Sequence, residues 1–290
     1  GDVIIIKELQ NLRDENLNTF SVLMPVYDRD DIVSAFDSAI NSCLQNTVVP
    51  DEIIVVVDGP VRSDFVSKIK AFESKGLIIV VWLSKNMGIT VALNQGLKHV
   101  NSRYVFRADG DDVNRLNRFE VQLNMLNQGF GLVGGAICER DRDGRTLAIK
   151  RVPLQHDLIL RYGLRRCPFN HMTVAFELKS VQDVGGYPNY ISEVGLGEDW
   201  ALWMLLLKSG VRANNTDEIL VDAATDIGMY RRRGGVLKII SELKMQRFLV
   251  AISRKNILVA FFDLAAKSAF FIVPSKIRGF IYTKFLRDTN

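Results

Sequence analysis

The sequence is poor in the residues that mark several common classes of protein. Its 290 residues include three cysteines, Cys43, Cys138 and Cys167, which are odd in number and far apart. Neither a zinc-type cysteine pair nor a disulfide framework is therefore expected, and a reducing, cytoplasmic compartment fits this usage. The apolar run at residues 3–6 is too short for the core of a secretory signal. No Gly-x-Gly-x-x-Gly motif follows an early strand, which disfavours a dinucleotide-dependent dehydrogenase.

Charge is unevenly distributed along the chain. The net charge is +4, but residues 236–290 alone hold ten Lys or Arg and three Asp or Glu, or +7, which leaves −3 on the other 235 residues. We therefore predict a mildly acidic body over residues 1–235 and a basic tail over residues 236–290. The basic residues match no RNA- or DNA-binding motif, so no nucleic acid partner is expected.

Strand and helix patterns alternate through the first half of the chain. Continuous apolar runs predict strands, and apolar stripes at helical spacing predict the helices between them. The expected strands are residues 20–26, 52–58, 77–83 and 103–108, and the expected helices are residues 30–46, 62–74 and 89–99. This rhythm is typical of βαβ units, so the predicted fold class is α/β with a parallel sheet.

The second half has a more mixed pattern. Helices are expected at residues 114–127 and 198–209, and strands at residues 131–137, 145–152 and 172–176. Within the first of these strands, Gly134 and Gly135 predict a close approach of another part of the chain. Trp200 and Trp203 are three residues apart on the last helix, and we expect them in the core rather than on a sugar-stacking surface.

The most informative segment is Asp109-Gly110-Asp111-Asp112, which directly follows the expected strand at residues 103–108. Three carboxylates crowded at one end of a strand repel one another unless a positive charge lies there. Oxygen-rich clusters suit Mg²⁺ or Mn²⁺, and Mg²⁺ is commonly shared with substrate phosphates. The alternative is a surface turn, because Asp and Gly are common turn residues.

Polar motifs also end two earlier strands. Tyr27-Asp28 follows the first strand, and Asp58-Gly59 follows the second. In open parallel sheets, ligands bind at the carboxyl ends of the strands. Turn chemistry alone does not require three polar motifs at three such ends, so the coincidence predicts a functional site.

Five ordered motifs together resemble the family-two glycosyltransferases, which have a GT-A fold. The matching segments are residues 22–27, 54–60, 86–96, 107–112 and 197–200. The resemblance covers roughly residues 20–235 and implies a Rossmann-like, mostly parallel sheet flanked by helices. The acidic Asp-x-Asp-Asp motif is similar to that of bacterial enzymes that build O-antigen (lipopolysaccharide) or capsule repeat units on a polyprenyl-diphosphate lipid.

The resemblance implies that the acidic segment holds a metal ion and the leaving nucleotide. Asp111 is the first choice as direct ligand to Mn²⁺ or Mg²⁺, and Asp109 is expected to contact the ribose or the metal through water. Asp112 either ligates the metal or orients the other two. Gly110 is grouped with the donor-binding residues. A divalent metal neutralises the charge that develops on the departing UDP.

Further residues are assigned to the donor nucleotide. The resemblance implies that Pro25, Val26, Tyr27 and Asp58 cradle the uridine, with Asp58 accepting the uracil N–H; a plain turn residue is the alternative for Asp58. The residues at the entry to the helix at 89–99 are expected to approach the phosphates through backbone N–H groups, which favour anions at a helix N-terminus. These residues are Asn86, Gly88 and Asn94, and an ordinary capped helix is the alternative.

Inverting transfer needs a base that takes the proton of the attacking hydroxyl. The family pattern places this base at Asp199, whereas Glu198 contacts acceptor hydroxyls or simply favours the helix N-terminus. Both residues are also acceptable as ordinary first-turn carboxylates. Arg107 either touches the diphosphate or pairs with an aspartate. His171 is assigned to the acceptor or diphosphate, with a structural histidine as the alternative.

The basic run Arg231, Arg232 and Arg233 is expected to contact a diphosphate, on the donor or on a lipid acceptor, since arginine forks suit phosphate oxygens. A solvated basic turn is the alternative. Processive members of the family carry a Gln-x-x-Arg-Trp segment near this position. The chain lacks that segment, which argues for the addition of one sugar per encounter.

The tail at residues 236–290 combines apolar blocks with basic residues. Its most apolar stretch is residues 257–274, interrupted by Asp263 and Lys267. A charge near the bilayer centre costs several kcal/mol, so helices that lie in the membrane interface are expected instead of a spanning helix. The alternative is a helical appendage that packs on the body or on a second copy of the chain, as a homo-oligomer.

Together these features predict a metal-dependent inverting glycosyltransferase, peripheral on the inner face of the cell membrane. The expected donor is a UDP-hexose, with glucose or galactose, and the expected acceptor is a polyprenyl-diphosphate-linked sugar. One alternative is a catalytically inactive scaffold that binds nucleotide sugar; another is a transferase acting on a polyprenyl phosphate or another glycan. In a haloacid-dehalogenase phosphatase, the Asp-x-Asp motif should end the first strand. Here the motif ends a later strand, so this class is disfavoured.

Overall fold

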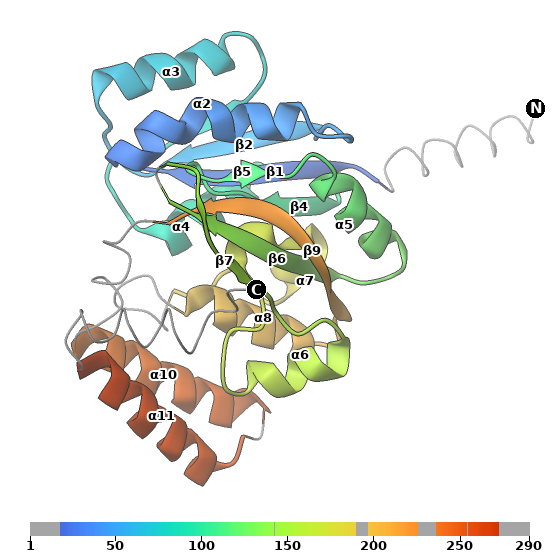
Figure 1. The fold of residues 1–290 in the computed structure, drawn as a ribbon, viewed down its shortest axis with the longest axis vertical. Helices are drawn as coiled ribbons and strands as arrows, with labels where there is room; N and C mark the ends of the chain where they lie inside the picture. Colours follow the sequence, from blue (N-terminus) through green and yellow to red (C-terminus); the bar gives the residue numbers. More distant parts are fainter. Residues whose placement is uncertain (1–17, 142, 190–196, 226–235, 254, 273–290) are drawn as a thin grey trace, which may run out of the picture.

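A nine-stranded sheet organises the chain, whose computed structural model describes residues 18–141, 143–189, 197–225, 236–253 and 255–272 (Figure 1). The strands are β1 (Phe20–Val26), β2 (Glu52–Val57), β3 (Ile79–Trp82), β4 (Tyr104–Arg107), β5 (Val113–Asn114), β6 (Leu132–Arg140), β7 (Thr146–Lys150), β8 (Ala175–Glu177) and β9 (Ala213–Ala224). Their order is β3-β2-β1-β4-β8-β6-β9-β5, and β7 pairs with β6.

Helices cover both faces of this sheet. They are α2 (Asp30–Leu44), α3 (Ser63–Glu73), α4 (Ile89–Leu97), α5 (Arg118–Asn127), α6 (His156–Gly163), the short 3₁₀ helix η1 (His171–Thr173), α7 (Leu178–Asp183), α8 (Glu198–Lys208), α10 (Val236–Ser253) and α11 (Ile257–Ile272). Helices α2, α3 and α5 pack on one face, α4, α6 and α8 pack on the other, and α10 packs on α8. The predicted α/β class is confirmed.

The first four strands form the parallel half that the sequence predicts, with β1 between β2 and β4 and with β3 at the edge. Alternate side chains of β1 enter different cores, because successive residues of a strand point to opposite faces. Val22 and Met24 join the core beneath α2, whereas Leu23 joins the core beneath α4 and α8. The βαβ rhythm of the sequence therefore reports a sheet buried on both faces.

The second half makes the sheet mixed. Strand β8 is antiparallel to β4 and to β6, whereas the long strand β9 runs parallel to β6. Strand β9 was not predicted, because its first half, residues 213–218, is mostly polar and lacks a strand-like apolar pattern. The close approach predicted at two glycines of β6 is confirmed: a Cβ on Gly134 would lie 2.7 Å from Asn215, and one on Gly135 would lie 2.6 Å from Leu220.

The described part of the tail forms a hairpin of α10 and α11 that packs on the body through α8 (Figure 1). Met245 and Leu249 of α10 belong to the same buried core as Trp203 of α8. The tail therefore shares a core with the transferase body, and a domain boundary at residue 235 stays a prediction. Within the described residues, no helix is both long and apolar enough to cross a bilayer.

Candidate active site

Polar residues from separate segments meet where the parallel strands end. Asp58 follows β2, Asp109 follows β4, and Arg29, just beyond the end of β1, reaches the segment after β4. Parallel strands deliver their carboxyl ends to one edge of the sheet, which is where this fold class binds ligands. The sequence prediction that the polar ends of the strands gather at one edge is consistent with this arrangement.

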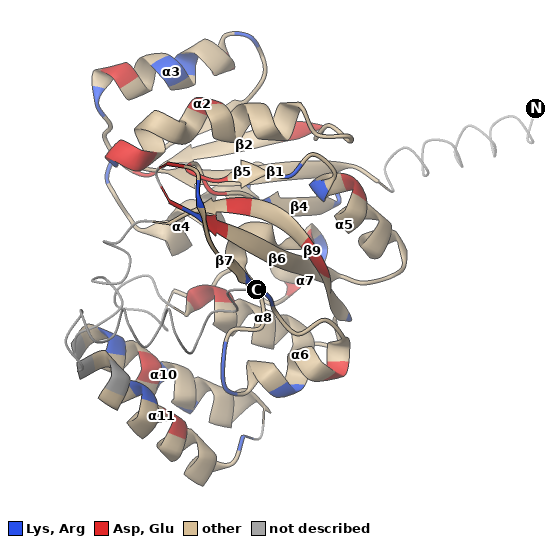
Figure 2. Cartoon of the chain, in the orientation of Figure 1, with Lys and Arg blue, Asp and Glu red and all other residues tan. Residues whose placement is uncertain are grey.

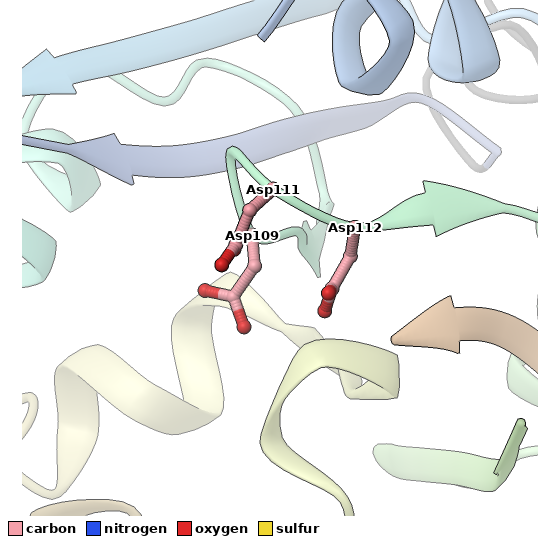
Figure 3. A group of neighbouring side chains, drawn as sticks. All are labelled: Asp109, Asp111 and Asp112. Carbon is pink, nitrogen blue, oxygen red and sulfur yellow. The ribbon is translucent and has the colours of Figure 1, made fainter. Parts of the chain in front are cut away.

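Three carboxylates form a compact group in the turn between β4 and β5 (Figure 3). One oxygen from each of Asp109, Asp111 and Asp112 lies within 4.8 Å of the others. Asp112 accepts a hydrogen bond from the backbone N–H of Ala224 at 2.8 Å, while its second oxygen is buried without a partner. An unsatisfied buried carboxylate oxygen is costly, and hard oxygen donors suit a divalent cation. The group thus fits Mg²⁺ or Mn²⁺.

Two arginines balance part of this negative charge. Arg107 Nη2 donates to Asp109 at 2.6 Å, and Arg29 Nη2 donates to Asp111 at 2.6 Å. Arg107 was predicted either to touch the diphosphate or to pair with an aspartate. It is buried, and the structure shows the pair with Asp109. Arg29 was missed by the sequence analysis, although its position just after Tyr27 and the end of β1 was a usable signal.

The electrostatics of the carboxylates differ from one another. Burial, and then the charge of Asp109, raises the pKa of Asp111 to about 6. Burial and both neighbouring aspartates raise the pKa of Asp112 well above its usual range. Burial is the largest single effect on Asp109 and acts to raise its pKa, but the charge and hydrogen bond of Arg107, together with the charges of His171 and Arg29, lower that pKa overall. Three full negative charges are therefore unfavourable here without a further cation.

Asp58 shapes the loop that enters α4. Its two carboxylate oxygens accept backbone N–H groups of Met87 at 2.7 Å and Gly88 at 2.9 Å. Gly59 has a φ of +95°, and a Cβ there would lie 2.5 Å from the nitrogen of Asn86, so only glycine fits without strain. Asp58 thereby positions the predicted phosphate-binding loop, while its contact with uracil stays a prediction.

The remaining donor residues occupy different environments. Gly88 precedes α4 with a φ of +86° and has open space where a Cβ would lie. Asn94 donates to the Tyr187 carbonyl at 2.8 Å and accepts from the Tyr187 N–H at 2.9 Å, so its amide holds a neighbouring loop. Asn86 is exposed.

The segment after β1 borders the acidic turn. Pro25 and Val26 end β1, and Val26 fills the space beside Gly110, where a Cβ would lie 2.7 Å from it. The hydroxyl of Tyr27 accepts a hydrogen bond from Arg29 at 2.8 Å. Contacts of these residues with a nucleotide stay predictions.

The two carboxylates that begin α8 have different surroundings. Asp199 is partly exposed, accepts the N–H of Trp200 at 2.7 Å, and receives a weak hydrogen bond from the Cys167 thiol at 3.7 Å. Glu198 is 3% exposed, and one of its oxygens is buried without a partner. Burial, and then the charge of Asp199, raises the pKa of Glu198 to about 7. Trp200 and Trp203 lie in the core, as predicted.

His171 is influenced by both groups of carboxylates, because the charges of Asp109 and Asp199 both act on its ring. Its Nε2 is 3.1 Å from the hydroxyl of Tyr187, a buried residue that the sequence analysis missed and for which the sequence offered no signal. Burial, and then the charge of Arg107, lowers the pKa of His171 to about 4, so the ring is neutral near pH 7. The charge of Arg107 also acts to lower the pKa of Asp109 and that of Glu198, so this arginine influences both groups of carboxylates.

The basic run of Arg231, Arg232 and Arg233 lies outside the described residues, so its predicted contact with a diphosphate has no structural description.

The raised pKa of Glu198 predicts a pH-dependent gain in stability for Glu198→Gln. The wild-type carboxyl is favoured in its neutral form, so its contribution to the free energy of unfolding is intact below its unfolded pKa and is lost as pH rises towards about 7. The variant should therefore match wild type near about pH 4.5 and exceed it by about 3 kcal/mol at about pH 8. Urea unfolding at several pH values measures this difference. Glu73→Gln, which removes an exposed carboxyl of α3, is the matched control and should give no such gain.

The chain has a GT-A fold. Two solved structures have the same fold. One is Staphylococcus aureus TarS 1-349 in complex with UDP-GlcNAc, with a TM-score of 0.57 at 17% identity over 92% of this chain and 87% of that chain. The other is the mannosyltransferase PcManGT from Pyrobaculum calidifontis in complex with GDP-Man and Mn²⁺, with a TM-score of 0.56 at 16% identity over 89% and 71%.

The chain belongs to glycosyl transferase family 2, whose sequence profile matches residues 21–183. It is 36% identical over 271 residues to the UDP-Gal:alpha-D-GlcNAc-diphosphoundecaprenol beta-1,3-galactosyltransferase of Escherichia coli, an alignment that covers 92% of this chain and 96% of the relative. The predicted family, GT-A fold and enzyme class are thereby confirmed, and the protein is a glycosyltransferase.

Proposed function

We propose that the protein transfers a hexose from a UDP-sugar, with inversion, to a sugar carried on a polyprenyl diphosphate during assembly of an O-antigen or capsule repeat unit. The observation that carries this proposal is the 36% identity, over 92% of the chain, to a galactosyltransferase that uses UDP-Gal and a diphosphoundecaprenol-linked GlcNAc. Galactose is therefore the preferred sugar and glucose the alternative. The reaction takes place at the cytoplasmic face of the membrane, where the protein is peripheral.

The proposed roles fall into two groups, one at the start of α8 and one at the acidic turn. At α8, Asp199 accepts the proton of the acceptor hydroxyl as that oxygen attacks the anomeric carbon and the bond from this carbon to UDP breaks. Glu198, whose pKa burial raises to about 7, retains a proton near neutral pH and donates a hydrogen bond to the acceptor. UDP-galactose carries an α-linked sugar, so the β-linked product of the Escherichia coli relative is consistent with inversion.

At the acidic turn, this chain's residues position the nucleotide. Asp111, Asp109 and Asp112 are the proposed holders of Mg²⁺ or Mn²⁺, which when bound neutralises the charge of the departing UDP. The Pyrobaculum mannosyltransferase, which shares only the fold, was solved with GDP-Man and Mn²⁺, in keeping with this proposal. Arg107 adds a buried positive charge beside Asp109, and Asp58 holds the loop before α4 in place through the N–H groups of Met87 and Gly88.

A panel of donors tests the proposed function directly. Release of UDP is measured with UDP-galactose, UDP-glucose and UDP-N-acetylglucosamine, with and without a synthetic GlcNAc-diphosphate lipid. We expect acceptor-dependent release with UDP-galactose and a β-linked product by NMR. UDP-galactose binding without any release would indicate a nucleotide-sugar-binding scaffold. Transfer only to a polyprenyl phosphate or to another glycan would replace the proposed acceptor.

A further inference from the structure

Both acidic side chains of the hairpin of α10 and α11, Glu242 and Asp263, are buried. Lys255 Nζ lies 2.7 Å from Asp263 and Lys267 Nζ lies 2.7 Å from Glu242, so both acidic residues of residues 236–272 are engaged in ion pairs. Arg165 of the body donates to Asp263 at 2.8 Å, which fastens the hairpin to the segment after α6. Asp263 and Lys267, the charged residues that interrupt the apolar stretch of the tail, therefore form ion pairs within the protein.

The opposite side of the hairpin, which we name the outer face, is apolar. Its most exposed members are Ile257 at 71%, Leu258 at 65%, Phe261 at 63% and Phe262 at 66%. Between the two helices this face contains a groove of about 360 Å³, whose lining includes Leu243, Val250, Ile257, Phe261 and Leu264. Figure 2 shows the charged residues of these two helices, in blue and red, among the uncharged residues in tan.

This distribution is the reverse of what water favours. A helix on the surface of a protein in water normally buries its apolar side and exposes its polar side. Here Asp263 is buried, whereas Phe261 and Phe262 are exposed on the same helix. A contiguous apolar patch of this kind marks a surface that is covered by another phase or partner.

Charge distinguishes a membrane from a second copy of the chain. Arg247 is exposed and lines the groove, and the acidic residues Glu242 and Asp263 are buried and face inward. Two outer faces in a symmetric dimer would bring their arginines towards each other, and no exposed acid on the described hairpin would compensate. An anionic leaflet offers both an apolar interior for the phenylalanines and negative headgroups for the arginine.

We propose that the outer face docks on an anionic bilayer, with Phe261 and Phe262 in the acyl region and lipid chains in the groove beside Arg247. The inference rests on the proposed function, because a polyprenyl-linked acceptor is presented by a membrane. The hairpin packs on α8, and Lys267 lies 4.6 Å over the ring of Trp200, next to the proposed base Asp199. Docking on this face would therefore hold the catalytic helix near the leaflet that carries the acceptor.

Vesicle flotation of the full chain tests the docking face. Wild type should float with phosphatidylcholine vesicles that contain phosphatidylglycerol. Phe261→Gln/Phe262→Gln should bind them roughly tenfold or more weakly, because two large apolar side chains no longer leave water. Arg247→Gln should lose about fivefold on the anionic vesicles and nothing on neutral ones. The matched control is Val49→Gln/Leu116→Gln, at 55% and 65% exposure on the body, which should float like wild type.

Two further measurements separate the possible outcomes. Transfer to a water-soluble, short-chain acceptor should be unchanged in the phenylalanine variant, so a loss of flotation is not a loss of folding or of the proposed activity. Flotation of that variant equal to wild type would overturn the docking face and leave the transferase proposal standing. If light scattering found that wild type is a dimer and that the same substitutions make it a monomer, the outer face would bind a second copy of the chain rather than a membrane.

Discussion

Replacing Asp111 with asparagine should lower the rate of sugar transfer by about 10³-fold or more, because a neutral amide is a much weaker ligand for a divalent cation. Burial, and then the charge of Asp109, raises the pKa of Asp111 to about 6, so a nearby cation favours its ionised form. The variant should also lose the increase in UDP affinity that Mn²⁺ produces. Calorimetry with and without Mn²⁺, beside an assay of UDP release, measures both effects.

The ion pair between Arg29 and Asp111 requires a separate control, since the asparagine variant removes that pair as well. Arg29→Gln leaves the Asp111 carboxylate in place and removes the ion pair with it, together with the contacts of Arg29 with Tyr27 and Asp31. We expect this variant to retain the effect of Mn²⁺ on UDP affinity. If both variants lost it equally, the loss in the Asp111 variant would no longer identify this carboxylate as a ligand of the metal.

The sequence predicted the parallel half of the fold because the signals there are local. Each strand from β1 to β4 is a short apolar run, and the polar residues after β1, β2 and β4 stand next to those runs in the chain. A parallel sheet then brings them together by its topology alone. Asp109, Asp111 and Asp112 were found in this way, without knowledge of any long-range contact.

The parts that sequence reasoning missed depend on contacts between distant segments. Asp112 accepts a hydrogen bond from the N–H of Ala224 in β9. This strand was not predicted, because its first half is mostly polar. The contact between the Tyr187 hydroxyl and His171 depends on the tertiary fold, and no sequence periodicity predicts it. These contacts form only when the fold brings Ala224 of β9 to Asp112 and Tyr187 to His171.

The charges of the tail are an instructive case. In the sequence, Asp263 and Lys267 interrupt an apolar stretch, and they were interpreted as evidence against a spanning helix. In the structure they pair with Lys255 and Glu242 beneath the hairpin, so the face opposite to them is more apolar than the composition indicates. The direction in which a charge points, rather than its presence, decides what kind of surface a helix offers.

The two ends of the site should respond differently to substitution, and this separates binding of the nucleotide from chemistry. The acidic turn follows β4, whereas Glu198 and Asp199 begin α8. A donor bound at the turn would keep its contacts when α8 is altered. This expectation leads to the second large effect.

Replacing Asp199 with asparagine should lower transfer by about 10²- to 10⁴-fold while leaving Mn²⁺-dependent UDP binding unchanged, because only the acceptor of the proton is removed. Asparagine keeps the size of the side chain and its hydrogen bond to the N–H of Trp200. Single-turnover measurements of sugar transfer, together with UDP titrations, test this expectation. Turnover close to that of wild type would exclude Asp199 as the base and direct attention to Glu198.

Cys167 supplies the matched control for that experiment, because its thiol contacts Asp199 without being a proton acceptor of comparable strength. Cys167→Ser retains a donor at this position and should keep most of the activity. If the serine variant were as inactive as Asp199→Asn, the loss would reflect the packing around the start of α8, and the effect at Asp199 would no longer demonstrate proton transfer. A normal rate in the serine variant beside a slow asparagine variant assigns the defect to the carboxylate itself.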